Sequence, residues 1–375
     1  MNGLSRDVYP VVVEPAILEK PWGRAGAGPE LVSGADAALK VGEIWLTADG
    51  EVSSRAENGP AAGSRLTDLR RAWGVSLLGR RFAGREDRPF PLLLKFIHAA
   101  AALSVQVHPD DETAERLEGE GPGKTEAWHI LGAKPGAWLI LGLRPGVGRQ
   151  GLYRALEEGN VETVFCRVTV RRGETYYVRA GLLHAIGPGV TLYEIQQNVD
   201  LTYRFYDWGR LDEAGRPRPL QVTKAMAALD VRPGEPVPYT GLAFEERGAR
   251  VRMLAAGRYF VLERVAFSGD WEVWLDGSRF ELITVIGGRG WLEAAGLSAP
   301  LPLEPGRTVL LPAELPRTVL SAAASQGLTL LRAYVPDLEA EVVRPLLDRG
   351  FTARDILPLA GHQRPNDLSA FFDQT

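Results

Sequence analysis

Short apolar segments of strand length recur along most of the chain and are separated by turns. Such segments occupy Val8–Val13, Leu39–Thr47 and Phe90–Ile97, and further ones follow from Ala127 to Asp207. The 42 glycines and 26 prolines are scattered between these segments, so they indicate many turns. A succession of short strands and turns favours an all-β barrel or sandwich.

Only a few segments have the periodicity or the terminal signals of helices. Apolar residues recur at near-helical spacing in Ser64–Arg81, and Pro109–Glu112 places a proline and three acids at a helix start. Gly148–Asn160 and Val222–Leu229 are further short helical segments. The pattern therefore predicts a mainly β fold with a few short helices.

The length of 375 residues is sufficient for two domains with sizeable cores. The strand pattern weakens in a proline-rich segment and resumes from Tyr259. We therefore predict an N-terminal domain over residues 1–211, a connecting segment over 212–240 and a smaller β domain over 241–335. Residues 336–375 are predicted to form a tail with one amphipathic helix.

Composition excludes several classes of partner. The net charge of −4 gives no reason to expect binding to nucleic acid or to an anionic membrane, and no run of 18 apolar residues is present. The single cysteine, Cys166, cannot form an internal disulfide, and the first ten residues lack a signal-peptide pattern. We therefore expect a cytoplasmic protein.

The stretch from Leu103 to Trp128 carries polar side chains in strand-like segments. Side chains alternate between the two faces of a strand, so Ser104, Gln106 and His108 share one face. Lys124 and Glu126 are likewise two residues apart and share a face if that segment is extended. Burying such groups is costly unless they bind something, which makes the stretch a candidate site.

Four residues have the chemistry of a divalent metal site. His184 lies between glycines at a turn, where a side chain can point into a barrel mouth. Together with Gln106, His108 and Glu126 it offers two imidazoles, one carboxylate and an amide oxygen, which suit zinc and similar ions. One anionic ligand leaves the ion a residual positive charge that can polarise a sugar oxygen. The alternative is that these histidines are ordinary surface or hydrogen-bonded residues.

A third polar segment, Tyr193–Arg210, has two interpretations. Glu194, Arg204 and Arg210 could line a site for an anionic substrate, because guanidinium groups suit phosphate and developing oxyanions. Arg204 could instead belong to a polar strand in which it pairs with a neighbouring aspartate. The residues alone leave both interpretations open.

Four motifs in this order resemble those of the type I phosphomannose isomerases in their short bacterial form. They are SVQVHPDD, GKTEAWHIL, GLLHAIGPG and EIQQNVDLTYRFYDWGR, and the early PWG and GEIW segments belong to the same pattern. The resemblance covers about residues 8 to 335. It implies a double cupin, which consists of two β-jelly-roll barrels with the metal in the first barrel.

The resemblance also implies roles for single residues. The zinc ligands of the family, one ion per chain, fall on Gln106, His108, Glu126 and His184. In the second domain Arg317 stands where the cupin motif has histidine, so we expect no metal there. The remaining implied roles are substrate binding or catalysis, and they fall on Ser104, Lys124, Glu194, Arg204 and Arg210.

The family interconverts mannose 6-phosphate and fructose 6-phosphate, by moving a proton between C2 and C1 through a cis-enediol. The resemblance therefore implies a phosphosugar isomerase in which Arg204 stabilises the enediolate and Lys124 contacts the substrate. Glu194 is the candidate proton carrier, and a metal-bound water is its alternative. Arg210 is a further candidate for substrate binding.

Two alternative functions remain open at this point. One is a sugar-phosphate-binding cupin without catalysis, and the other is a cupin isomerase or epimerase that acts on a different sugar. The presence of the full set of candidate ligands together with Arg204 favours an enzyme. We expect a monomer or a weak homodimer.

Overall fold

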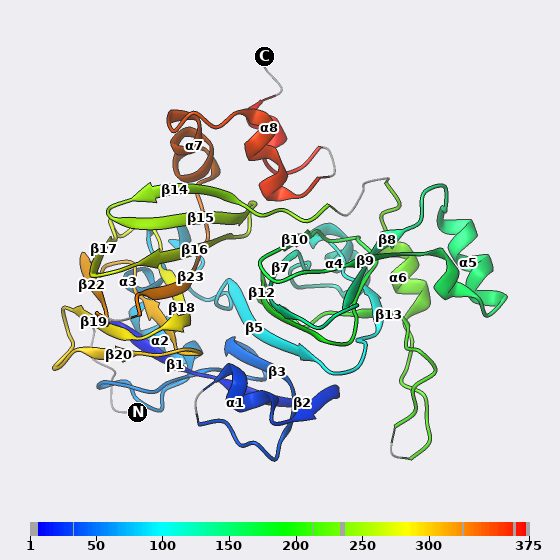
Figure 1. Cartoon of the computed structure of the whole chain (residues 1–375), viewed down its shortest axis with the longest axis horizontal. Coiled ribbons are helices and arrows are strands. Elements are labelled where there is room, and N and C mark those ends of the chain that lie inside the picture. Colours follow the sequence, from blue (N-terminus) through cyan, green and yellow to red (C-terminus); the bar gives the residue numbers. More distant parts are fainter. Residues whose placement is uncertain are drawn as a thin grey trace.

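The structure is a computed structural model that describes residues 7–32, 34–212, 214–232, 237–324, 326–362 and 365–372. The segment predicted as a connection and the predicted tail lie partly outside these residues. Strands form two pairs of antiparallel sheets that lie side by side, with short helices around them (Figure 1). The prediction of a mainly β fold with a few short helices is therefore confirmed.

The first pair of sheets, on the right in Figure 1, contains a six-stranded and a five-stranded sheet. In sheet order, the larger sheet contains β10 (Thr175–Val178), β7 (Glu126–Ala133), β12 (Val190–Gln197), β5 (Leu92–Ala99), β3 (Lys40–Thr47) and β2 (Ala16–Ala25). The smaller contains β13 (Tyr203–Tyr206), β6 (Val105–Val107), β11 (His184–Ile186), β8 (Trp138–Leu143) and β9 (Phe165–Thr169).

The second pair contains an eight-stranded and a four-stranded sheet. The larger sheet follows the order β14 (Leu242–Glu246), β15 (Ala249–Ala256), β16 (Val261–Phe267), β23 (Leu328–Tyr334), β18 (Glu281–Gly288), β21 (Thr308–Leu311), β1 (Val11–Glu14) and β4 (Arg55–Ala56). The smaller contains β17 (Asp270–Trp274), β22 (Arg317–Ala322), β19 (Gly290–Ala294) and β20 (Leu301–Leu303).

The start of the chain contributes to the second pair of sheets. β1 pairs with β21, and β4 pairs with β1, so two strands from the first 60 residues extend a sheet built mainly from residues after 240. The predicted domain limits remain a prediction. Any such division has to assign β1 and β4 to the second pair of sheets.

The described α-helices are short, at four to nine residues each. They are α1 (Ala27–Leu31), α2 (Leu66–Trp73), α3 (Val75–Leu78), α4 (Asp111–Glu118), α5 (Arg149–Glu157), α6 (Val222–Ala228), α7 (Arg344–Asp348) and α8 (Ala353–Ile356). The helix predicted over Ser64–Arg81 is divided into α2 and α3 at Gly74, whose φ is 49°. The tail has more helical structure than the one helix predicted, because α8 follows α7.

None of the helices in the described part of the chain has the length and apolar character that crossing a bilayer requires.

Separate hydrophobic clusters fill each pair of sheets and the space between the pairs. Trp128 and Leu139 belong to the cluster inside the first pair, and Trp271 and Ile283 to the cluster inside the second. A third cluster joins the two pairs, and the hydroxyl groups of Tyr193 and Thr284 lie 3.1 Å apart across it. The two barrels therefore share a continuous buried interface.

Truncation of Phe280 should measure how strongly this interface stabilises the chain. Phe280 is fully buried, and its ring centroid lies 4.6 Å from that of Phe90. Phe280→Ala should lower the free energy of unfolding by about 3–5 kcal/mol, because it removes a buried ring and leaves a cavity. Urea denaturation followed by tryptophan fluorescence provides the measurement.

The matched control is Phe371→Ala, since Phe371 is 38% exposed. Loss of less than about 0.5 kcal/mol is expected for this control. Equal losses for the two variants would contradict the assignment of Phe280 to a shared core.

Candidate metal centre and its cavity

Strand register places three polar side chains in one row across the five-stranded sheet. Gln106 on β6 lies directly opposite His184 on β11 and directly opposite Arg204 on β13. Directly opposed residues of antiparallel strands project from the same face of the sheet. The register therefore directs Arg204, Gln106 and His184 into the same space.

A second row crosses the six-stranded sheet. Glu194 on β12 lies opposite Trp128 on β7 and opposite Lys95 on β5, and Lys95 lies opposite Trp45 on β3. Trp128, Glu194 and Lys95 line the same cavity as the first row. The site is thus formed between two facing sheets of one barrel.

Three potential metal ligands converge between these rows. One ligand atom each from His108, Glu126 and His184 lie within 4.8 Å of one another, and all three side chains are buried. His108 Nε2 is 3.6 Å from Glu126 Oε2, and His184 Nε2 is 3.4 Å from Glu126 Oε1. The two imidazoles therefore face the two oxygens of a single carboxylate.

Backbone carbonyls fix the tautomer of both imidazoles. His108 Nδ1 lies 2.8 Å from the Leu201 carbonyl oxygen, and His184 Nδ1 lies 2.8 Å from the Leu182 carbonyl oxygen. A carbonyl oxygen only accepts hydrogen bonds, so each Nδ1 carries the proton and each Nε2 presents its lone pair. This is the tautomer that the imidazole ligands of metal sites require, and the two Nε2 lone pairs now face Lys124 Nζ at 3.0 Å and the Gln106 amide nitrogen at 3.3 Å.

Burial also keeps both imidazoles neutral. Loss of hydration lowers the pKa of His184 to about 3. Burial and the neighbouring Lys124 and His184 hold the pKa of His108 well below its usual value. At neutral pH, protons therefore do not compete with a cation for these nitrogens.

The environment of Glu126 fits a cation. Its side chain is fully buried, and among the described residues neither carboxylate oxygen accepts a hydrogen bond. Lys124 Nζ lies 2.8 Å from Oε2. The angle at which the two groups meet does not fit a hydrogen bond, so the contact is an ion pair. A buried carboxylate in this state gains most from direct coordination of a cation.

Gln106 completes the candidate ligand set. Its amide nitrogen lies 3.3 Å from His184 Nε2, and its amide oxygen lies 3.5 Å from the Ser104 hydroxyl. A half-turn of the amide group would exchange these two atoms and place the oxygen beside His184. The set of two imidazoles, one carboxylate and one amide matches the preferences of zinc.

A cavity of about 340 Å³ adjoins the cluster and is lined mostly by polar side chains. Its charged lining residues are Lys20, Glu43, Lys95, Lys124, Glu194, Asp200, Arg204 and Arg218. Five of these eight side chains are cationic and three are anionic. The cavity therefore suits a polar ligand with negative charge.

Lys95 forms the centre of a buried charge network. Its ammonium lies 3.4 Å from Glu194 Oε2 and 3.9 Å from Glu43 Oε2. Burial lowers the pKa of Lys95, but Glu194 and Glu43 outweigh this effect and raise it above its usual range. Trp128 Nε1 donates a 2.9 Å hydrogen bond to the other oxygen of Glu194. Glu194 is thus held in a fixed orientation at the cavity wall.

Two arginines reach the opposite wall of the cavity. Arg204 Nη1 donates a 2.9 Å hydrogen bond to the Pro219 carbonyl, while its buried Nε has no hydrogen-bond partner among the described residues. Burial lowers the pKa of Arg204, and the nearby Arg218 lowers it further. Two adjacent guanidinium groups in one wall are an arrangement that a phosphate or carboxylate would stabilise.

Arg210 lies behind this wall. Its guanidinium donates to the Ala102 carbonyl at 2.6 Å and pairs with Asp207, which also pairs with Arg218. Arg210 is absent from the residues that line the cavity. Its predicted contact with substrate remains a prediction, and in this geometry Arg210 holds Asp207, which in turn orients Arg218.

The structure brings the other predicted site residues together and adds several that sequence reasoning missed. Ser104, Lys124, Glu194 and Arg204 all line the cavity beside the ligand cluster. The residues missed are Lys20, Glu43, Lys95, Asp200 and Arg218. A lysine inside the apolar run FPLLLKFI was a usable signal for Lys95, whereas Arg218 comes from the segment interpreted as a connection.

Two barrels of antiparallel strands, with a candidate metal centre inside the first, define a bicupin protein. Residues 11–126 match the family described as "Phosphomannose isomerase type I, catalytic domain". The mannose-6-phosphate isomerase ManA of Bacillus subtilis is 32% identical over 307 residues, which are 81% of this chain and 93% of that protein. The chain belongs to the type I phosphomannose isomerase family.

Solved structures agree with this assignment. The crystal structure of a mannose 6-phosphate isomerase from Bacillus subtilis superposes with a TM-score of 0.76 at 30% identity, covering 86% of this chain and 99% of that one. A zinc-bound mannose 6-phosphate isomerase structure matches with a TM-score of 0.65 at 16% identity, over 87% of this chain and 99% of that one. The second likeness is evidence for the fold alone.

The neutral histidines predict that acid destabilises the metal-free protein. Unfolded histidine has a pKa near 6.5, whereas the folded pKa of His184 is about 3. The unfolded chain therefore binds more protons in this window, so stability is lost as the pH falls from about 6.5 towards 3. The expected slope is about 1.4 kcal/mol per pH unit for each such histidine.

Denaturant unfolding of the chelated protein at several pH values provides the measurement. His184→Gln should reduce the slope, because the variant lacks one proton-binding group. The control is Gln106→Met, which replaces a neutral side chain beside His184 by another of similar size. This variant should keep the pH slope of the wild type. An unchanged slope in His184→Gln would contradict the buried neutral state of this imidazole.

Proposed function

We propose that this chain interconverts mannose 6-phosphate and fructose 6-phosphate. The observation that carries the proposal is the His108–Glu126–His184 cluster, which contacts Lys124 in the lining of a predominantly cationic cavity within one barrel. Membership in the type I phosphomannose isomerase family supports the same activity. The reaction moves one proton between C2 and C1 of the opened sugar through a cis-enediol.

Gln106, His108, Glu126 and His184 would hold one zinc ion per chain. When bound, zinc supplies a positive charge that polarises sugar oxygens and lowers the energy of a developing oxyanion. The neutral state of both imidazoles and the lack of hydrogen bonds to the Glu126 oxygens from the described residues support this assignment. Lys124, at 2.8 Å from Glu126 and 3.0 Å from His108 Nε2, adds a second positive charge beside the cluster.

Arg204 is the residue proposed to stabilise the enediolate. It lies opposite Gln106 in the strand register, and its charge is permanent. A fixed guanidinium in a cavity that excludes water stabilises charge without reorganisation during the reaction. Arg218 and Lys20, at the same cavity, are proposed to bind the phosphate group.

Glu194 is the residue proposed to carry the proton. Trp128 and Lys95 fix its carboxylate at the cavity wall, so the group is oriented before substrate binds. A carboxylate held in this way can accept a proton from one carbon and return it to its neighbour if both lie within reach. Ser104 and Lys124, also at the cavity, are proposed to orient the sugar hydroxyls.

Removal of metal should abolish the isomerase activity, and zinc should restore it. The substrates to compare are mannose 6-phosphate and free mannose, in a coupled assay with and without a chelator. Mannose 6-phosphate should react and free mannose should not, since the cationic lining favours a charged substrate. Full activity of rigorously metal-free protein would refute the proposal, as would equal turnover of both sugars.

Arg204→Ala should lower kcat by about a hundredfold or more while zinc still binds. Loss of a transition-state interaction lowers kcat, whereas loss of uniform substrate binding raises only KM. Arg204→Lys keeps a positive charge and should retain more activity than Arg204→Ala. Steady-state kinetics with metal analysis of each variant provide the measurement, and an effect confined to KM would make Arg204 a binding residue only.

A further inference from the structure

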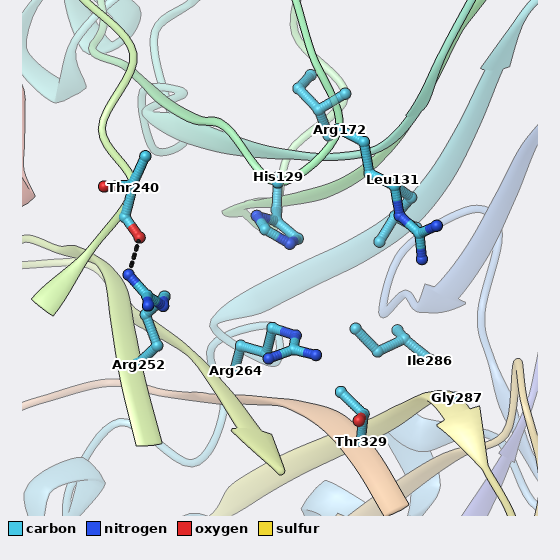
Figure 2. Close-up of a pocket in the computed structure, with 11 residues that line it drawn as sticks. His129, Leu131, Arg172, Thr240, Arg252, Arg264, Ile286, Gly287 and Thr329 are labelled. Carbon is cyan, nitrogen blue, oxygen red and sulfur yellow. Dashed lines mark hydrogen bonds between the residues drawn. The ribbon is translucent and has the colours of Figure 1, made fainter. Parts of the chain in front are cut away.

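A second cavity, of about 610 Å³, lies between the two barrels and shares no lining residue with the catalytic cavity. β7 contributes His129 on one side, and β15 and β16 contribute Arg252 and Arg264 on the other. Arg172, from the turn before β10, completes a set of three arginines. Figure 2 shows the three guanidinium groups and the His129 imidazole arranged around one space.

Two of these arginines face each other across adjacent strands. Arg252 on β15 is directly opposite Arg264 on β16 in the antiparallel register. Like charges in directly opposed positions destabilise a sheet, because the side chains project from the same face at close range. The strand pairing therefore carries an unfavourable contact that a bound anion would convert into a favourable one.

Among the described lining residues there is neither an aspartate nor a glutamate. Within the described part of the chain, Arg252 donates to the backbone carbonyls of Thr240 and Gly241, at 3.0 and 3.4 Å. Burial lowers the pKa of Arg264, and the charges that lower it further are Arg252, Arg250 and Arg172.

The cavity on the far side of the second barrel has a different composition. It also contains arginines, but Arg332 lies 2.6 Å from Glu263, and Arg279 lies 2.6 Å from Glu281. Those arginines are neutralised by carboxylates of the chain itself. The three arginines at the barrel junction have no carboxylate beside them in the cavity lining. Their charge would therefore be neutralised by an anion that is not part of the chain.

His129 provides a neutral donor at the same place. Its side chain is buried, and its Nδ1 lies 3.0 Å from the Thr175 hydroxyl. Burial and the charges of Arg264 and Arg172 lower its pKa to about 4, so the ring is neutral at physiological pH. The Thr175 hydroxyl can donate to Nδ1, and in that tautomer Nε2 carries the ring proton and can donate to an anion in the cavity.

We propose that this junction binds a small organic anion that carries two phosphate groups. Three guanidinium groups supply the charge for more than one phosphate, and the volume exceeds that of a single phosphate. Ile130, Leu131 and Ile286 line another part of the cavity and would contact the carbon skeleton. The site contains none of the residues assigned to metal binding or catalysis.

Calorimetric titration of the zinc-loaded full chain tests this site. The probes are inorganic phosphate and 1,3-propanediol bisphosphate, which has two phosphates and no sugar ring. We expect the bisphosphate to bind more tightly than phosphate, and Arg264→Gln to weaken its binding by about tenfold or more. Tighter binding of inorganic phosphate than of the bisphosphate would overturn the assignment of an organic bisphosphate.

The matched control is Arg289→Gln, which removes the same charge from an exposed position between β18 and β19, outside the cavity lining. Binding to the control should equal that of the wild type. A contribution from the catalytic cavity would be the same in all three proteins and would not depend on Arg264. Equal affinity of Arg264→Gln and wild type, or an equal loss in the control, would overturn the proposal.

Thermal unfolding separates an anion site from a purely structural arginine. In chloride buffer, Arg264→Gln should unfold at the same temperature as the wild type or higher, because it removes the repulsion from Arg252. Addition of the bisphosphate should raise the unfolding temperature of the wild type more than that of the variant. A lower unfolding temperature for the variant in chloride, with equal shifts on ligand addition, would refute the proposal.

Discussion

Glu126 carries a carboxylate at a place from which two facing sheets exclude water. Loss of hydration costs several kcal/mol for such a group unless cations or donors replace the water. The side chains around it offer one ammonium group and two imidazole lone pairs, and lone pairs repel a carboxylate. A divalent cation between these groups would convert the repulsion into coordination. The ammonium group of Lys124 supplies only part of the positive charge that this arrangement needs.

The register between neighbouring strands positions the other side chains of the site. Gln106 is held between His184 and Arg204 because β6 is the strand between β11 and β13, and a shift of β6 by one residue would turn the Gln106 side chain to the other face. The same alternation gives β7 two roles. Trp128 projects into the catalytic cavity, while His129 projects towards the junction with the second barrel.

Local periodicity was enough to predict the mainly β class and to place Gln106 and His108 on one face. Alternation along a strand depends only on the backbone, whereas the approach of His184 to Gln106 depends on pairing across 78 residues. Its place between glycines made His184 a candidate ligand, and the family resemblance implied the same role. Lys95 was missed because it lies in an apolar run, where its carboxylate partners are on other strands. The Arg252–Arg264 pair could not be predicted, because a strand sequence does not specify its neighbour's register.

Anomalous diffraction from crystals of the protein grown with zinc is the most direct test of the central claim. We predict one strong peak per chain at the zinc edge, within coordination distance of His108, Glu126, His184 and the Gln106 amide oxygen. Glu126→Gln should abolish this peak while the fold is retained, because the variant lacks the anionic ligand. A peak located elsewhere, or no peak in the wild type, would contradict the account.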